Sequence, residues 1–344
     1  MKKILAFLLA AMLLLSIVGC APQTQSDAQP AATEPAADTS QPTQDSVSAA
    51  DGDTVTIGYY LPLSGANATY SPYYLNAINL AFKKINAEGG LNGKQIVTAS
   101  YDTTSSTEEA AKVATKLVTV DKISICISSP MSSEVRASSK TLNDAGVFTM
   151  VMGISSALLD PESFEYGFRG SFNTDNTIPA CLNMIDTLGA KSVAILFSQG
   201  DASITNATQF RDQSTELGYD CTAFETFDLG EMDYSAQCIN IVSTNPDCVF
   251  LAVEGDYMGT CVKQLRQYGF EGTIISREEL SIPQREAAGD AMNGYAFPSL
   301  YVSWPSLEEA KPNVNEQMYS YLESYYNEYG ELPASIWAYE VWDA

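Results

Sequence analysis

The chain has 344 residues, with 18 Lys and Arg against 42 Asp and Glu and no histidine, which gives a formal charge of −24 at pH 7. Nucleic acids and anionic lipid surfaces are bound through basic patches, so we expect no nucleic acid as a partner. The absence of histidine excludes Ser-His-Asp hydrolysis, Cys-His catalysis and the most common zinc ligand sets.

Residues 1–19 have the form of an export signal. Two lysines precede an apolar run over residues 4–15 that is too short to cross a bilayer comfortably, and small residues follow. The ending at residues 17–20 (IVGC) resembles the lipobox of bacterial lipoproteins, in which the cysteine becomes the first mature residue and carries lipid. We therefore expect a lipoprotein signal peptide over residues 1–19 and a lipid on Cys20. The alternatives are an ordinary secretory peptide cleaved near Ala21 and an uncleaved segment.

Residues 20–52 consist almost entirely of Ala, Pro, Gln, Thr, Ser and Asp. Such a stretch buries too little apolar surface to offset the entropy of ordering it, so we expect a disordered tether. The rest of the chain is longer than one hydrophobic core usually serves, and we expect two domains in it.

Strand and helix patterns alternate along the remaining chain. In the first half we expect strands over 54–61, 95–101, 123–128 and 147–152, helices over 72–86, 107–120 and 134–145, and a helical stretch from Ser155. Thr107 is the expected N-cap of its helix. In the second half we expect helices over 176–188, 205–217, 235–243, 258–268 and 282–291, and strands over 192–197, 221–227, 248–253, 272–276 and 295–302. This alternation predicts an α/β fold with two doubly wound parallel sheets in succession.

Six cysteines follow Cys20, and none of them forms a C-x-x-C pair. Cys126 and Cys248 lie in apolar, strand-like runs, where cysteine behaves as a small hydrophobic residue. We expect buried thiols, although an extracellular protein can also oxidise a pair, and spacing alone assigns no connectivity.

Ligands of open α/β sheets bind at the carboxyl ends of the strands, so the loops that follow the strands are the candidate sites. The loops of the first half offer serines and glycines next to helix N-termini, whose backbone N–H groups suit a carboxylate. The loops of the second half offer acids beside Arg277, namely Asp201, Glu254, Asp256, Glu278 and Glu279. A ligand with an anionic end and an ammonium end matches both surfaces.

Several segments resemble the periplasmic-binding-protein type I family of branched-chain amino acid ABC importers. The most specific is INAEGGLNGK at residues 85–94, and IGYYLPLSG at 57–65 resembles the opening strand and loop of that family. Further matching segments are 101–102, 189–196, 233–236, 246–251, 288–295 and 325–330. The resemblance extends from about residue 54 to the last residue.

The resemblance implies two lobes joined by a hinge, with a ligand held in the cleft between them. By this resemblance the first lobe is 54–170 plus 303–344, and the second is 171–302. Residues 334–344 resemble the start of a helix that relatives continue into a final crossover, which implies a truncated reading frame.

The resemblance also implies a set of ligand-binding residues. The ligand carboxylate is expected at the hydroxyl of Ser155, the backbone of Gly153, and Ser128, Ser129, Ser132 and Ser133. The ligand ammonium is expected at Glu278. Asp175 corresponds best to an aspartate that follows the Phe-Arg segment of relatives. The aromatic positions of relatives correspond to Ala202 and Glu254, which implies a ligand that is more polar or doubly cationic than a branched-chain amino acid.

The function implied is that of an extracytoplasmic, lipid-anchored solute-binding protein that captures an amino acid or related small polar ligand. Its partners would be the ligand, the permease subunits of an ABC importer and the membrane that holds the lipid. We expect a monomer that is not an enzyme and has no cofactor and no metal. The alternatives are a ligand-sensing receptor ectodomain and a surface enzyme that acts on small amides.

Overall fold

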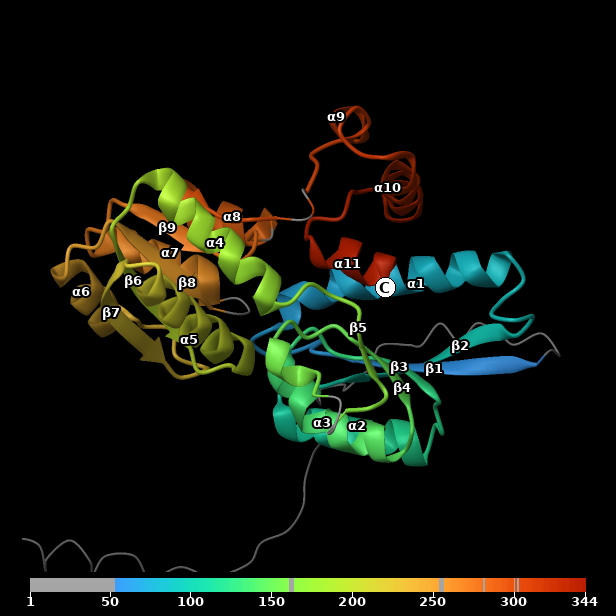
Figure 1. Ribbon diagram of the computed structural model, residues 1–344. Helices are drawn as coiled ribbons and strands as arrows, with labels where there is room; N and C mark the ends of the chain where they lie inside the picture. The colour runs from blue at the N-terminus through green and yellow to red at the C-terminus, as the bar shows by residue number, and fades with distance from the viewer. Residues whose placement is uncertain (1–52, 161–163, 254–256, 281, 300, 302) are drawn as a thin grey trace, which may run out of the picture. The chain divides into compact units, whose positions relative to one another are not determined.

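The computed structural model describes residues 53–160, 164–253, 257–280, 282–299, 301 and 303–344 (Figure 1). The predicted signal peptide, Cys20, the tether and Glu254 lie outside these residues.

Two five-stranded parallel sheets form the framework of residues 53–344. The first has the order β2-β1-β3-β4-β5, from β1 (Thr54–Leu61), β2 (Gln95–Asp102), β3 (Ile125–Ile127), β4 (Phe148–Val151) and β5 (Gly167–Arg169). The second has the order β10-β9-β8-β6-β7, from β6 (Ser192–Ser198), β7 (Asp220–Phe227), β8 (Cys248–Ala252), β9 (Thr273–Ser276) and β10 (Tyr295–Ala296). The predicted α/β fold with two parallel sheets is confirmed.

Helices connect the strands within each sheet. In the first they are α1 (Ser71–Ala87), α2 (Thr107–Thr119) and α3 (Ser132–Asp144), with short 3-10 turns at Ala68–Tyr70 and Ser156–Leu158. Helix α4 (Thr174–Leu188) connects β5 of the first sheet to β6 of the second. Within the second sheet the helices are α5 (Asp201–Glu216), α6 (Ser235–Ser243), α7 (Tyr257–Gln267) and α8 (Ile282–Ala288), followed by a 3-10 turn at Gly289–Met292. Figure 1 shows α1 on one face of the first sheet and α2 with α3 on the other.

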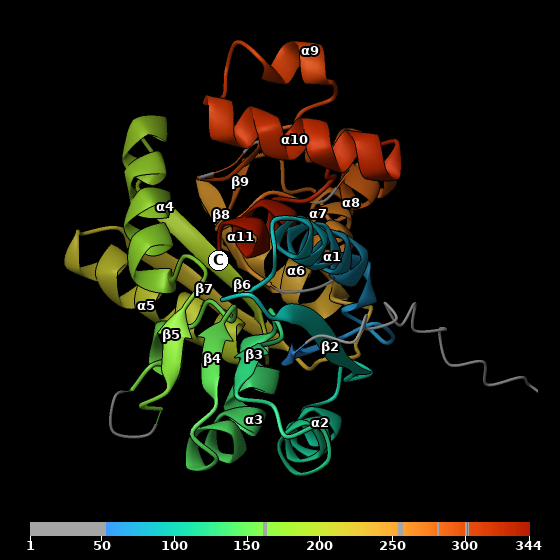
Figure 2. The same ribbon diagram turned by 90° about the vertical axis from the view of Figure 1, so that its right-hand side faces the viewer.

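Three more helices follow the second sheet: α9 (Leu307–Ala310), α10 (Glu316–Tyr329) and α11 (Trp337–Asp343). Figure 2 shows α10 and α11 beside α1, and both helices contact it. Leu80 of α1 shares a buried cluster with Tyr321 and Tyr325 of α10. The last part of the chain therefore packs on the helix that follows the first strand, whereas the exact bounds of the two lobes stay a prediction.

Local differences from the sequence predictions have physical reasons. The N-cap of α2 is Ser106 and not Thr107, because the Ser106 hydroxyl accepts a hydrogen bond from the Glu109 N–H at 3.3 Å. Helix α5 begins four residues before the predicted 205, since Asp201 and Ala202 already belong to its first turn. The predicted strand over 295–302 pairs with β9 only at Tyr295 and Ala296. The edge strand β5 is three residues long, too short for its pattern to be seen.

The sheets are buried because helices cover both of their faces. All five residues of β8 are buried, and Phe250 at its centre stacks on Phe210 of α5 with ring centroids 3.8 Å apart. The six described cysteines are free thiols, five of them fully buried and Cys221 half-buried. The expectation of thiols rather than disulfides is confirmed for these six residues.

Phe250→Ala removes a fully buried ring and leaves a cavity between β8 and α5. We expect the free energy of unfolding to fall by about 3 to 5 kcal/mol in urea denaturation. Phe168→Ala is the control, because the Phe168 ring is 49% exposed and stacks only on Phe148 at the surface, so a loss of at most about 1.5 kcal/mol is expected. Equal losses in the two variants would contradict this assignment of the core.

Candidate functional site

A group of buried serines follows β3 and β4, at the carboxyl end of the first sheet. The Ser128 hydroxyl accepts a hydrogen bond from the Met152 N–H and donates one to the Ser129 carbonyl, both at 3.0 Å. The Ser129 hydroxyl accepts a hydrogen bond from the Met131 N–H at 3.1 Å. Both hydroxyls are therefore engaged with the backbone, where they fix the two loops against each other.

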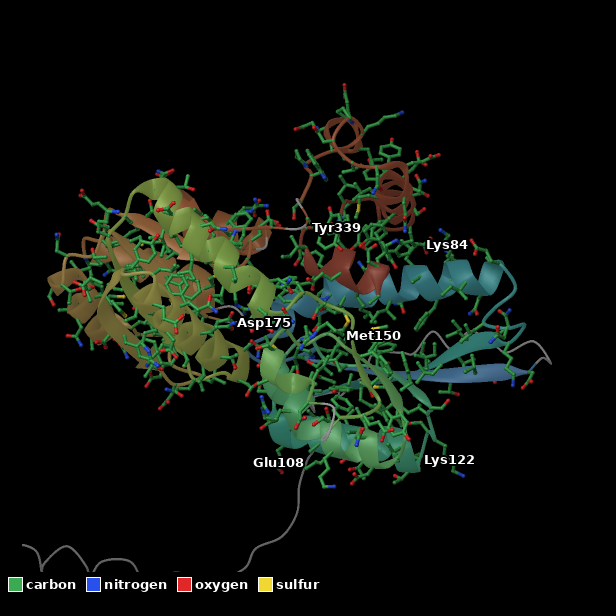
Figure 3. The ribbon with its side chains drawn as sticks, in the orientation of Figure 1. Lys84, Glu108, Lys122, Met150, Asp175 and Tyr339 are labelled. Atoms are coloured by element: carbon green, nitrogen blue, oxygen red, sulfur yellow. The ribbon has the colours of Figure 1, made fainter. Side chains whose placement is uncertain are left out.

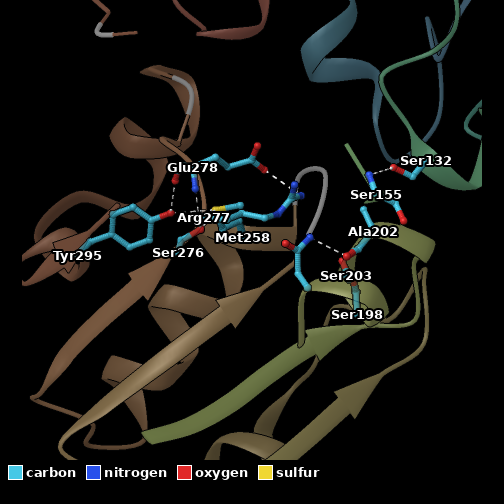
Figure 4. Close-up of polar contacts among 11 residues, drawn as sticks. Ser132, Ser155, Ser198, Ala202, Ser203, Met258, Ser276, Arg277, Glu278 and Tyr295 are labelled. Carbon is cyan, nitrogen blue, oxygen red and sulfur yellow. Dashed lines mark hydrogen bonds and ion pairs between the residues drawn. The ribbon is translucent and has the colours of Figure 1, made fainter. Parts of the chain in front are cut away.

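Ser132 and Ser155 connect the two loops to the second half of the chain. The Ser132 hydroxyl accepts a hydrogen bond from the Ser155 N–H at 3.1 Å (Figure 4). The Ser155 hydroxyl lies 3.1 Å from that of Thr205 on α5. Ser155 is fully buried, and Ser133 beside Ser132 is half-buried. Since α3 begins at Ser132 and its N-cap Met131 makes no side-chain cap, the N-terminal N–H groups of α3 give this place a positive potential.

Arg169 holds the loop after β4, a role that the sequence did not reveal. Its guanidinium donates hydrogen bonds to the Gly153 and Ser155 carbonyl oxygens, the latter at 3.0 Å. Gly153 itself allows close packing, because a Cβ there would lie 2.7 Å from Leu158 Cδ1 and 3.1 Å from Ser132 Cα. Arg169 was visible in the sequence only as part of the Phe-Arg segment used to place Asp175.

Glu278 and Arg277 follow β9, at the carboxyl end of the second sheet. They are 1% and 3% exposed, and the Glu278 Oε1 lies 3.2 Å from the Arg277 Nη2 (Figure 4). Burial raises the pKa of the Glu278 carboxyl, and the charge of Arg277 offsets part of that rise. The Oε2 of Glu278 and the Nε and Nη1 of Arg277 have no hydrogen-bond partner among the described residues. This pair therefore keeps donors and an acceptor available to a ligand.

The other predicted site residues lie in different surroundings. Asp175 is exposed in the first turn of α4 (Figure 3), where it accepts a hydrogen bond from Gln209 at 3.0 Å. Ala202 is 2% exposed and packs in one buried cluster with Tyr59, Met152 and Trp337, next to Ser155 in Figure 4.

Sequence reasoning missed three buried side chains, those of Tyr74, Trp337 and Glu340. The Tyr74 ring of α1 lies 6.2 Å from the Trp337 ring of α11, and Glu340 follows Trp337 by three residues on the same helix. Glu340 is 3% exposed, and burial followed by the nearby charge of Glu278 raises its pKa well above the ordinary value. The spacing of apolar residues placed Tyr74 on a helix, and the segment 334–344 was recognised only as the start of a helix.

A cavity of about 280 Å³ adjoins Glu340. It is lined by Met150, Arg169, Gly170, Ser171, Phe172, Tyr301, Glu340, Asp343 and Ala344. The Tyr301 hydroxyl donates a hydrogen bond to Asp343 at 2.6 Å on its rim.

In the described part of the chain, no group of three or more Cys, Asp and Glu side chains is arranged to hold a metal ion. No helix there is both long and apolar enough to cross a membrane.

Comparison with known proteins identifies the family. Residues 54–344 match the family described as periplasmic binding protein, and the chain therefore belongs to that family. It is a family of ligand-binding proteins that are not enzymes, which removes the predicted alternative of a surface enzyme. The predicted resemblance to branched-chain amino acid binding proteins is confirmed.

Individual relatives agree with this assignment. An amino acid binding protein of Pseudomonas aeruginosa is 27% identical over 227 residues, which are 64% of this chain and 60% of that relative. The chain thus matches less than two thirds of this relative's length. The crystal structure of a leucine binding protein LivK from Thermotoga maritima has a TM-score of 0.75 at 23% identity and covers 84% of this chain and 80% of that one. The substrate binding protein LivJ from Streptococcus pneumoniae, in complex with isoleucine, has a TM-score of 0.71 at 25% identity, with coverages of 85% and 81%.

Gly153→Ala places a methyl group against Leu158 and the first turn of α3. We expect the free energy of unfolding to fall by about 1 to 3 kcal/mol, measured by chemical denaturation, because both neighbours belong to packed elements. Gly259→Ala in α7 is the matched control, since its nearest neighbour would be the Gln284 carbonyl oxygen of α8 at 3.5 Å, which is an ordinary contact distance. Unchanged stability of Gly153→Ala would show that the loop after β4 is loosely packed.

The raised pKa of Glu340 makes the stability of the protein depend on pH. The folded state holds this proton more tightly than the unfolded state, whose pKa is near the ordinary 4.5. The stabilisation from the bound proton is therefore complete below that value and is lost as the pH rises toward the folded-state pKa.

Between about pH 5 and 8, we expect wild-type stability to fall relative to Glu340→Gln, with a slope of at most about 1.4 kcal/mol per pH unit. Denaturation at a series of pH values measures the difference between the two proteins. A constant difference would show that Glu340 titrates as it does in the unfolded chain.

Proposed function

We propose that this protein is the extracytoplasmic solute-binding component of an ABC importer and that it binds an amino acid or a related small polar molecule. The observation that carries the proposal is the position of Ser155. Its backbone N–H donates to Ser132 at the start of α3, and its buried hydroxyl lies against Thr205 of α5, where loops of the two sheets meet. A ligand held there contacts residues from both halves of the chain.

The proposed carboxylate subsite consists of the Ser155 hydroxyl and the N-terminal N–H groups at Ser132 and Ser133. An uncapped helix N-terminus and a buried hydroxyl are suitable donors for an anion. Arg169 positions this subsite indirectly, because it holds the Gly153 and Ser155 carbonyl oxygens. Ser128 and Ser129, whose hydroxyls are bonded to the backbone, support the same loops.

The proposed ammonium subsite is the carboxylate of Glu278. One of its oxygens pairs with Arg277, and the other has no hydrogen-bond partner among the described residues. An ammonium group placed beside this second oxygen would satisfy it and would offset the cost of burying the charge. The names of the relatives, an amino acid binding protein and a LivJ protein in complex with isoleucine, support a ligand of this class.

We also propose where the protein is held in the cell and which proteins it contacts. A lipid on Cys20 would hold the protein on the outer side of the bacterial cell membrane, with residues 20–52 as its tether. The permease subunits of the importer are the proposed protein partners of a monomeric binding protein. Mass spectrometry of the mature N-terminus would test the lipid directly.

Ser155→Ala and Glu278→Gln test the two subsites. A thermal-shift screen against amino acids, amides and polyamines identifies the ligand, because a binder of the folded state raises the melting temperature. Calorimetry with that ligand should then show affinity lowered by about 5- to 100-fold in Ser155→Ala, through loss of a buried hydrogen bond to a charge. Glu278→Gln should weaken an ammonium ligand more than a neutral one.

Ser139→Ala is the control, because the Ser139 hydroxyl donates only to the Arg136 carbonyl within the same helix. Its affinity should equal that of the wild type. Unchanged affinity in Ser155→Ala would reject the proposed carboxylate subsite.

A further inference from the structure

The buried charges near α11 do not balance. Glu278, Glu340 and Arg277 are each at least nine-tenths buried, and Glu278 lies close enough to Glu340 for their charges to repel. Arg277 forms its ion pair with Glu278. Two carboxylates and one guanidinium leave one negative charge without compensation. Neither oxygen of Glu340 has a partner in ordinary hydrogen-bond geometry among the described residues, although the Phe172 backbone is near enough to lower the pKa of its carboxyl.

The Tyr74 hydroxyl is a second buried polar group near α11 that lacks a hydrogen-bond partner among the described residues. Tyr74 is fully buried, its hydroxyl has no hydrogen-bond partner among the described residues, and both Glu340 and Glu278 raise its pKa. The Tyr74 ring also lies 6.2 Å from that of Trp337, which precedes Glu340 by three residues on α11. A buried tyrosine hydroxyl normally finds a partner, and a polar group of a ligand between α1 and α11 would supply one.

We propose that Glu340 is a second anionic group of the ligand site and that the ligand is an amino acid with a cationic side chain. This inference rests on the proposed function, and it assigns the α-ammonium to Glu278 and the side-chain cation to Glu340. The net charge of such a ligand is +1, which cancels the one excess negative charge of the two buried carboxylates and the guanidinium. Glu340 also lines the cavity beside the aromatic rings of Phe172 and Tyr301, which are favourable neighbours of a cation.

The groups that face Glu340 oppose a lone negative charge there. Glu278 and Asp343 raise its pKa, while Arg277 and the backbone of Phe172 lower it by less than burial raises it. Glu340 in turn raises the pKa of Tyr74 and Tyr301. A cation bound beside Glu340 stabilises the charged form of its carboxylate, so we expect proton release to accompany binding.

The test is calorimetry on the full chain with L-arginine and with L-citrulline, its neutral analogue of nearly the same shape. Each titration is run in two buffers of different ionisation enthalpy, which reveals protons released on binding. The variants are Glu340→Gln, Glu278→Gln and, as a control, Glu323→Gln, since Glu323 is an exposed acid of α10 away from the cavity. Melting curves of each variant verify that it is folded.

We expect the wild type and Glu323→Gln to bind arginine about tenfold or more tightly than citrulline, with release of a proton. Glu340→Gln should lose this preference and the proton release while it still binds citrulline. Glu278→Gln should weaken both ligands. A merely structural role of Glu340 would change stability but would leave the arginine to citrulline ratio unchanged.

Failure of this inference differs from failure of the proposed function. Equal affinity of the wild type for arginine and citrulline, or stronger binding of neutral amino acids, would overturn the cationic ligand alone. Equal weakening of arginine and citrulline in Glu340→Gln would also overturn it. Absence of binding to every amino acid in the thermal-shift screen would overturn both.

Discussion

The contacts of Ser155 are the constraint on which the rest of the site depends. Its N–H is bound by Ser132 at the start of α3, and its hydroxyl lies against Thr205 of α5. The same residue thus connects a loop of the first sheet with a helix of the second, with no exposed surface of its own. Arg169 holds this loop in place by donating hydrogen bonds to the Gly153 and Ser155 carbonyl oxygens. A site built from fixed loops needs little reordering when a ligand enters, which conserves binding energy.

The two ends of the site differ in their chemistry for a topological reason. Parallel strands of each sheet direct their carboxyl ends to one edge, and the loops there carry the polar side chains. The first sheet supplies hydroxyls and a helix N-terminus, whereas the second supplies the Glu278 and Arg277 pair and α11 supplies Glu340. Burial makes each of these charges costly unless it is paired. Under the proposed function, the affinity and selectivity for a ligand depend on how that ligand completes the pairing.

The sequence predicted the sheets better than the site. Alternating patterns placed most strands of both sheets, because strands buried on both faces read as apolar runs. The strand β5 was not predicted because three residues are too few to show an alternation of apolar and polar side chains. The first turn of α5 was missed because Asp201 and Ala202 show no helical periodicity. The serines and Glu278 were placed through family resemblance. Tyr74 and Glu340 were not found, because their proximity results from the packing of α11 on α1, which no local pattern encodes.

The most direct measurement is a crystal structure of the full chain with the amino acid that gives the largest thermal shift. The account predicts the ligand carboxylate within about 3 Å of the Ser155 hydroxyl and of the α3 N-terminus, and its ammonium within about 3 Å of Glu278. A ligand bound with these ends reversed, or at a place away from Ser155 and Glu278, would contradict it.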